Sequence, residues 1–185
     1  MLIDLTLTIT PEMLADARTS TKKELQGHLG THFDVMDHDF PLEYTQRKGL
    51  IFDVSHVKDR DVEITDIDLG KVEKEMFVAF YTGFIEREPY GSPDYFQNHP
   101  QLSDALIDAL VEKEISMIGL DFAGVRRGKE HTPKDQMCAD QGVFIVENLC
   151  NLKQLLGNGP DFLACTYPMR IAGVSGLPCR VIAKI

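Results

Sequence analysis

The segment GHLGTHFDVMDH (residues 27–38) holds three of the six histidines of this 185-residue chain. It places His28, His32, Asp34 and His38 at i, i+4, i+6 and i+10. Imidazole nitrogens and carboxylate oxygens are the ligand atoms that Zn²⁺, Mn²⁺ and Fe²⁺ take in proteins. Two histidines and one aspartate leave coordination positions open for water and substrate, as a catalytic centre requires. The residue types and their spacing therefore predict a metal site at His28, His32 and Asp34.

The spacing also predicts a bend in the backbone. A straight strand would separate His28 from His32 by roughly 13 Å, too far for two ligands of one ion. One helical turn or a tight bend would bring them together, and Gly27 and Gly30 permit such a bend at low steric cost. An extended chain from His32 onward would keep Asp34 on the same side. A solvated polar turn is the competing interpretation, but the added aspartate, histidine and glycines favour the metal site.

Two further residues have side chains suited to the chemistry of such a site. The ordinary pKa of a histidine lies near neutrality, so His38 suits a general acid and base. Glu147 directly follows the apolar run VFIV, where an unpaired carboxylate is costly to bury. From the residues alone, Glu147 is either a functional carboxylate or a solvated strand end. Water bound at the open metal positions would deprotonate near neutral pH and attack a carbonyl.

Composition and charge narrow the class of protein. An apolar fraction of 43% with 26% charged residues is typical of a globular chain, and 185 residues predict one domain spanning 1–185. A net charge of −10 argues against nucleic acid and anionic membranes as partners. No signal peptide and no apolar run of about 20 residues is present, so we expect a cytoplasmic protein. Four scattered cysteines without a CxxC pair predict free thiols: Cys138, Cys150, Cys165 and Cys179.

Alternating apolar residues and β-branched runs predict many strands, with helices interspersed. The strands are expected within 3–9, 49–57, 75–84, 115–124, 143–149, 161–171 and 180–185. Helices are expected over 102–113, with Ser103 as N-cap, and over 151–157. Residues 10–26 are expected to form a loop with a short helical turn at 12–17, and residues 87–100 another loop. This mixture predicts one α/β domain around a mixed sheet or barrel.

The histidine-rich segment carries a family resemblance. HLGTHFDVMDH resembles the pattern HxGTHxDxPxH of the cyclase family of metal-dependent hydrolases, which includes bacterial kynurenine formamidase. Four further stretches resemble that family in the right order: YTGF, NHPQLSDALIDALVEKEISMIGLD, FIVENLCNL and GVSGLPCRVIAKI. The resemblance implies a compact α/β fold of the swivelling β/β/α type, with a barrel-like sheet and flanking helices. It also implies that His28, His32, Asp34 and Glu147 bind metal, and that His38 transfers protons.

The function implied by the resemblance is hydrolysis of a linear or cyclic amide C–N bond, as in arylformamidases. Metal-bound hydroxide would attack the carbonyl, and His38 would pass a proton to the leaving nitrogen. Zn²⁺ is the expected ion, with Mn²⁺ as the alternative. A non-catalytic metal- or ligand-binding protein on the same fold is the alternative function, because fold alone does not determine activity.

Two positions depart from the family pattern. Met36 stands where the family has proline, so the loop lacks a fixed φ angle. The formamidases carry a second-metal histidine twelve residues before the glutamate, and here that position is Asp135. His131 could replace it only if the loop shifted. The stretch RRGKEHTPKD, with Pro133 and many charges, predicts an exposed loop. We therefore expect one firmly bound ion per chain.

The substrate and the assembly are less constrained by the sequence. Residues 10–25 contain no aromatic residue and the chain has no tryptophan, so the aromatic clamp of the formamidases is absent. Tyr90, Tyr95 and Phe96 either line a pocket for a small-molecule substrate or anchor an interface. Together with the family resemblance, they predict a homodimer or higher homo-oligomer. Arg126 and Arg127 either orient a carboxylate substrate or are solvated.

Overall fold

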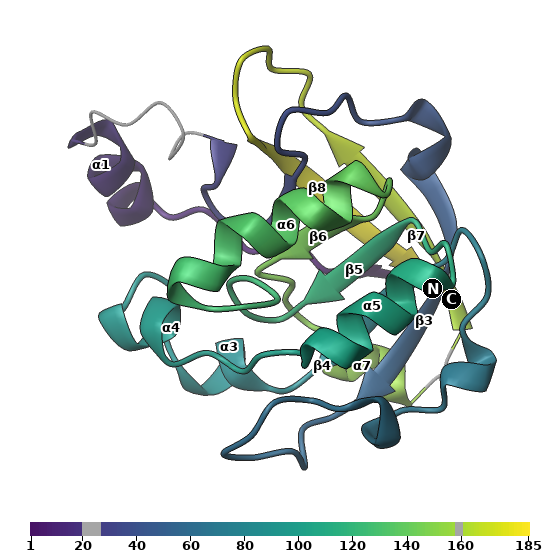
Figure 1. Ribbon diagram of the computed structural model, residues 1–185. Helices are drawn as coiled ribbons and strands as arrows, with labels where there is room; N and C mark the ends of the chain where they lie inside the picture. The colour runs from purple at the N-terminus through teal and green to yellow at the C-terminus, as the bar shows by residue number, and fades with distance from the viewer. Residues whose placement is uncertain (20–26, 158–160) are drawn as a thin grey trace.

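The computed structural model describes residues 1–19, 27–157 and 161–185, and eight strands form one mixed sheet within them (Figure 1). The strands are β1 (Leu2–Asp4), β2 (His32–Asp34), β3 (Gln46–Asp53), β4 (Phe77–Tyr81), β5 (Met117–Leu120), β6 (Phe144–Glu147), β7 (Asp161–Pro168) and β8 (Gly176–Lys184). Their order is β1-β8-β2-β6-β5-β4-β3-β7, and β7 pairs again with β8. Seven strands thus close into a barrel, and the predicted α/β fold with a barrel-like sheet is confirmed.

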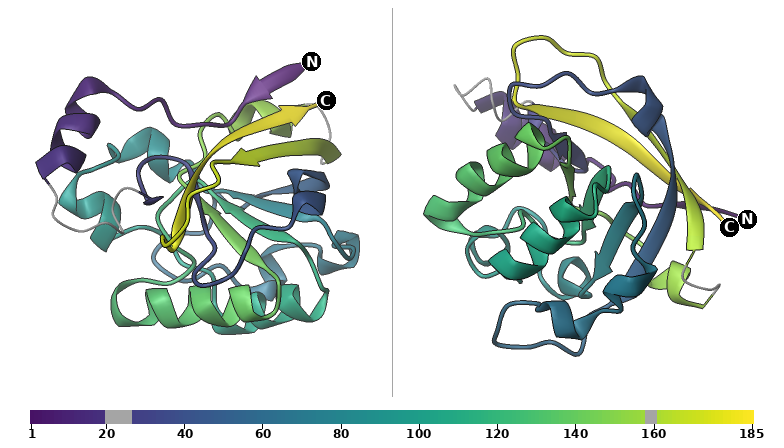
Figure 2. Two further views of the ribbon diagram at one scale, coloured as in Figure 1. Left: turned by 90° about the horizontal axis from the view of Figure 1, so that it is seen from above. Right: turned by 45° about the vertical axis from the view of Figure 1, so that its right-hand side comes forward.

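The barrel closes through β8, the longest strand. On one edge, Pro178 of β8 pairs with His32 of β2, and Lys184 pairs with Leu2 of β1. On its other edge β8 pairs antiparallel with β7 along six residues. Strands β1 and β2 therefore follow one another along the same edge of β8, and Figure 2 shows the N-terminal strand β1 (purple) beside the C-terminal strand β8 (yellow). The histidine-bearing strand β2 is held between β8 and β6.

Helices cover the parallel part of the sheet. Strands β3, β4, β5 and β6 run parallel, and helices lie in the β4–β5 and β5–β6 connections (Figure 1). The helices are α1 (Pro11–Thr19), α3 (Phe84–Arg87), α4 (Pro93–Gln97), α5 (Asp104–Glu112), α6 (His131–Asp140) and α7 (Lys153–Leu156). The expected cap is present, because the hydroxyl of Ser103 accepts a hydrogen bond from the amide of Leu106 at 3.2 Å. Parallel strands present their carboxyl ends at one edge, the usual place for a site.

Alternation along the strands supplies two apolar cores. In β4, Phe77 and Ala79 join the cluster of the barrel interior, whereas Val78 and Phe80 join the cluster beneath α5 and α6. All four are fully buried. A strand packed on both faces has little freedom to shift, so β4 to β6 form a rigid support for whatever their ends carry.

Asp121 joins two stretches that resemble family motifs. Its carboxylate accepts hydrogen bonds from the Thr82 amide at 3.0 Å, the Thr82 hydroxyl at 2.5 Å and the Gly83 amide at 2.6 Å. Burial raises the pKa of Asp121 to about 6, while the hydrogen bonds act in the opposite direction. The carboxylate therefore ties the end of β4 to the end of β5.

Several element predictions were wrong. Residues 11–19 form helix α1 rather than a loop with a short turn, and the expected loop at 87–100 contains α4. The remainder of the first predicted loop, 20–26, lies outside the described residues. Strand β1 ends at Asp4, well short of the expected residue 9. The stretch predicted as an exposed loop around 131–135 begins helix α6. Pro133 fits there because the first turn of a helix leaves its amides without internal partners.

No helix within the described ranges is long and apolar enough to cross a membrane. The described cysteines form no disulfide: Cys138 and Cys179 are buried, and Cys150 and Cys165 are partly buried. The scattered spacing predicts buried free thiols: the four are free, and burial is confirmed for Cys138 and Cys179.

Candidate metal centre

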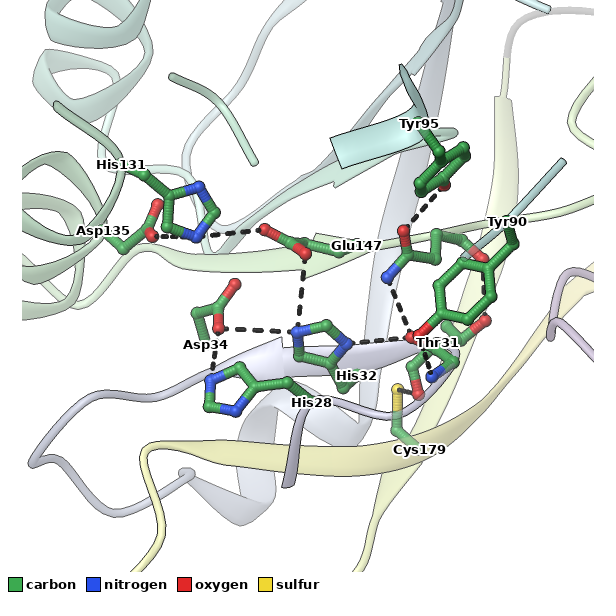
Figure 3. Close-up of polar contacts among 12 residues, drawn as sticks. His28, Thr31, His32, Asp34, Tyr90, Tyr95, His131, Asp135, Glu147 and Cys179 are labelled. Carbon is green, nitrogen blue, oxygen red and sulfur yellow. Dashed lines mark hydrogen bonds and ion pairs between the residues drawn. The ribbon is translucent and has the colours of Figure 1, made fainter. Parts of the chain in front are cut away.

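His28, His32 and Asp34, which we call the first ligand group, meet at the start of β2 (Figure 3). Nε2 of His28 lies 3.1 Å from Oδ1 of Asp34, and Nε2 of His32 lies 3.5 Å from the same oxygen. The two imidazole rings are 4.9 Å apart between centroids. Gly30 has a φ of 70° in the turn between them. The predicted bend is therefore present, and it brings together the three side chains that the spacing singled out.

The imidazole of His32 is oriented by the backbone of the same turn. Its Nδ1 donates to the carbonyl oxygen of Gly30 at 2.9 Å, which leaves Nε2 facing the carboxylates. Nδ2 of Asn148 also donates to the Gly30 carbonyl. Oδ1 of Asn148 accepts a hydrogen bond from the Tyr95 hydroxyl at 2.7 Å. The hydroxyl of Tyr90 accepts from the Gly30 amide at 2.9 Å. Such outer hydrogen bonds fix the tautomer of a metal-binding histidine.

Glu147 lies between the first ligand group and helix α6. It is the register partner of His32 across the antiparallel β2–β6 pair. Its Oε2 lies 3.5 Å from Nε2 of His32, and its side chain is nearly fully buried. The alternative that Glu147 is a solvated strand end is therefore wrong.

His131 and Asp135, which we call the second ligand group, approach Glu147 from the other side. They are one turn apart on α6, with Nε2 of His131 3.2 Å from Oδ2 of Asp135 and 3.8 Å from Oε1 of Glu147. Nδ1 of His131 donates to the carbonyl of Arg126 at 3.1 Å, the same arrangement as in His32. Asp135 is only 2% exposed. The prediction that His131 and Asp135 lie in an exposed loop is therefore wrong, since the helix turns both side chains inward (Figure 3).

Three carboxyl groups, those of Asp34, Asp135 and Glu147, are buried together in this space. Burial alone would raise the pKa of Asp34, but the His32 and His28 imidazoles outweigh burial and hold it below its usual range. Burial, reinforced by the charge of Asp34, raises the pKa values of Asp135 and Glu147 well above normal. Carboxylates crowded together resist joint ionisation unless a cation is present.

Unpartnered atoms point to the same conclusion. Within the described ranges, four buried side-chain atoms make no hydrogen bond: His32 Nε2, Asp34 Oδ2, Asp135 Oδ1 and Glu147 Oε1. A buried polar atom without a partner costs free energy. All four belong to one cluster of nitrogen and oxygen donors, so the cluster fits a divalent cation.

Two glycines provide the space for two of the imidazoles. A Cβ on Gly176 would lie 2.8 Å from Cδ2 and Cε1 of the His28 ring. A Cβ on Gly124, where φ is 96°, would lie 2.2 Å from Nδ1 of His131. Any larger residue at either position would therefore displace a ligand side chain.

His38 lies outside this cluster. Among the described contacts it pairs with Asp140 at 2.9 Å and Asp37 at 3.5 Å, and its side chain is 41% exposed. It lines a cavity of about 990 Å³ between the 35–45 and 169–175 loops. Its lining includes Val35 and Ser175, the chain neighbours of the paired residues Asp34 and Gly176, but none of the ligand residues themselves.

Other residues singled out in the sequence have structural partners. Met36 adopts a φ of 55°, which proline cannot take, so this loop departs from the family pattern in conformation as well as in residue type. The guanidinium of Arg126 pairs with Asp61 at 2.6 Å and with Glu130 at 2.6 Å. These ion pairs occupy the nitrogens that would otherwise bind a carboxylate substrate. Tyr95 is fully buried, whereas Phe96 is exposed.

The sequence reasoning missed two residues that contact this region, Asn148 and Asp140. Asn148 directly follows Glu147, and its φ of 59° turns its amide back toward Gly30. An asparagine after a strand-ending glutamate was a usable signal, because asparagine tolerates this conformation. Asp140 carried no such signal, since its role depends on α6, which was not predicted.

Comparison with known proteins places the chain in a family. Residues 3–126 match the model of the Cyclase family ("Putative cyclase"), and the chain belongs to this family. No match was found among curated proteins. The matched residues include the first ligand group, whereas His131, Asp135 and Glu147 lie beyond them.

Two solved structures share the fold. One is described as a potential metal-dependent hydrolase with cyclase activity; it is 22% identical, with a TM-score of 0.76 over 99% of this chain and 96% of that one. The other is isatin hydrolase A from Ralstonia solanacearum, 19% identical, with a TM-score of 0.76 over 99% and 91% of the two chains. At this level of identity, the comparison establishes the common architecture.

Proposed function

We propose that this protein is a metal-dependent hydrolase that acts on a linear or cyclic amide C–N bond. The observation that carries the proposal is the cluster of His28, His32, Asp34 and Glu147, in which buried atoms of His32, Asp34 and Glu147 have no hydrogen-bond partner. The structural neighbours described as a metal-dependent hydrolase and as isatin hydrolase support this class of reaction.

The chain's own residues have distinct parts in the proposed reaction. His28, His32 and Asp34 would hold a divalent cation, Zn²⁺ or alternatively Mn²⁺, with Glu147 as a further ligand. A bound ion supplies polarisation of the carbonyl and activation of water. The backbone carbonyl of Gly30 keeps Nε2 of His32 directed at the ion position. His38, on the cavity wall, takes up a proton and delivers it to the leaving nitrogen.

We further propose a second cation position at His131, Asp135 and Glu147. Our expectation of one ion per chain was based on an exposed loop around Asp135. Because Asp135 is buried and its Oδ1 has no partner, the basis for that expectation is removed. Glu147 has one carboxylate oxygen toward His32 and the other toward His131. It is therefore suited to act as a ligand shared by both cation positions.

A substrate panel tests the proposal. Protein loaded with Zn²⁺ or Mn²⁺ is assayed against formamides, other linear amides and cyclic amides, before and after chelation. We expect hydrolysis of at least one class, lost on chelation and restored by the ion. Ion binding without turnover across the panel would favour the alternative, a non-catalytic metal-binding protein on this fold.

A further inference from the structure

We propose that Asp140 is a positioning residue for His38, holding one imidazole nitrogen so that the other serves the proposed hydrolysis. The inference rests on the proposed function. Nε2 of His38 lies 2.9 Å from Oδ1 of Asp140, at the carboxyl end of α6, although the two residues are 102 positions apart in the chain. This contact joins the 35–45 loop to the helix that carries the second ligand group.

The contact belongs to a small network. The side-chain amide of Gln136 donates to Oδ1 of Asp140 at 2.8 Å and to Oδ1 of Asp37 at 2.7 Å. Asp37 in turn lies 3.5 Å from Nε2 of His38. Gln136 therefore links the two carboxylates that approach the same ring nitrogen of His38. An isolated surface ion pair contributes little to stability, so the consequence of this network is orientation rather than folding energy.

The tautomer follows from the partner. A carboxylate only accepts hydrogen bonds, so neutral His38 carries its proton on Nε2 and leaves Nδ1 as the proton acceptor. The hydrogen bond with Asp140, followed by the charge of Asp37, raises the pKa of His38 above its usual value. Asp39 and Arg170 are the other charged residues lining the same cavity. A raised pKa keeps more His38 protonated at neutral pH, as a donor to the leaving nitrogen requires.

One helix thereby serves both halves of the site. His131 and Asp135 lie in the first turns of α6, and Asp140 is its last residue. A helix rises about 1.5 Å per residue, so these groups span roughly 13 Å along one rigid element. Because Asp140 holds His38, helix α6 determines the distance between His38 and the second ligand group together with the 35–45 loop.

The test compares Asp140→Asn with Asp59→Asn. The first substitution keeps the side-chain oxygen but removes the charge beside His38. The second removes the same charge from an exposed turn with a φ of 56°, which asparagine tolerates. The ring nitrogens of His38 are followed by NMR across a pH titration in Zn²⁺-loaded protein, with His38→Gln to assign the signals. Wild type and Asp59→Asn should show the Nε2–H tautomer, and Asp140→Asn should lower the pKa of His38 relative to both.

Kinetics supply the second readout. In Asp140→Asn the alkaline limb of kcat against pH should move to lower pH by the same amount, with KM little changed, and Asp140→Glu should restore part of the difference. An unchanged His38 pKa, or a shifted pKa with a pH profile identical to wild type, would overturn the positioning role. If wild type hydrolyses no amide, the proposed function fails separately, while the NMR titration still decides whether Asp140 holds His38.

Discussion

His32 and Glu147 are direct partners across the β2–β6 pair, with Nε2 and Oε2 3.5 Å apart. Side chains alternate between the faces of a strand, so a shift of one residue in this pairing would turn Glu147 away from His32. The register of β2 against β6 therefore determines whether a four-ligand site exists. Packing of Phe33 and Val146, the next pair along, into the barrel interior holds that register.

Ion removal should destabilise the protein. An ion that binds only the folded chain, at a concentration about a thousandfold above its dissociation constant, adds about 4 kcal/mol of stability. For a chain of this size that corresponds to a rise in Tm of about 8–16 °C. Calorimetry of chelated and Zn²⁺-reloaded protein measures the difference. Equal Tm values for both forms would contradict tight binding at the cluster.

His38→Ala should lose turnover and keep its ion. General acid and base catalysis contributes about 10²–10⁴-fold, so kcat should fall by that factor. Metal content by elemental analysis should match wild type, because His38 makes no described contact with the first ligand group. Unchanged kcat would remove His38 from the mechanism.

The ligand groups should be separable by metal analysis. We expect about two ions per chain in wild type and about one in His131→Ala, because the described ion pairs of His131 are with Asp135 and Glu147 and not with His28, His32 or Asp34. His28→Ala should reduce occupancy at the first position instead. A wild-type content of about one ion, unaffected by His131→Ala, would rule out the second position.

Gly176→Ala should weaken ion binding although it replaces no ligand residue. The added Cβ would meet the His28 ring at 2.8 Å and the Gly27 carbonyl oxygen at 2.8 Å, so the imidazole must move. Gly157→Ala is the matched control, because a Cβ there has open space. A shift of about 1 Å in a ligand can cost about 10²-fold in activity. Titration with Zn²⁺ under competition by a chelator measures the affinity; equal affinities in both variants would contradict this account of Gly176.

The ion-free protein should lose stability as pH rises. The pKa values of Asp135 and Glu147 are raised above their ordinary 3.8 and 4.5, so the folded state retains protons that the unfolded chain has released. Stability from these groups is therefore present below pH 4 and declines above it, by up to about 1.4 kcal/mol per pH unit for each group. Asp34, whose pKa is lowered, acts only in the acid range. Urea denaturation from pH 5 to 8 should show the decline, and bound ion should abolish it.

The first ligand group was predictable because its signal is local. His28, Gly30, His32 and Asp34 lie within seven consecutive residues, and ligand spacing together with glycine requires the bend that the structure has. The strand-rich pattern predicts the fold class, a mixed sheet or barrel. It does not predict how the barrel closes, because no local sequence pattern indicates that β8 pairs with three other strands.

Helix α6 shows where sequence reasoning failed. HTPKDQMCAD has no clear apolar period, and its charges and proline indicated a loop. The helix is instead fixed by contacts from its inward side, where Asp135, Cys138 and Ala139 are buried against the sheet. Because Asp135 is directed at other ligands, its burial depends on residues far away in the chain. A propensity argument limited to ten residues does not contain that information.

The ligands and the cavity walls belong to different kinds of structure. His32, Asp34 and Glu147 lie on paired strands, whereas the cavity beside them is bounded mainly by the 35–45 and 169–175 loops. Loops accept insertions and substitutions that paired strands do not. Substitutions in the cavity walls can therefore change the shape of the cavity without changing the strands that carry the ligand side chains.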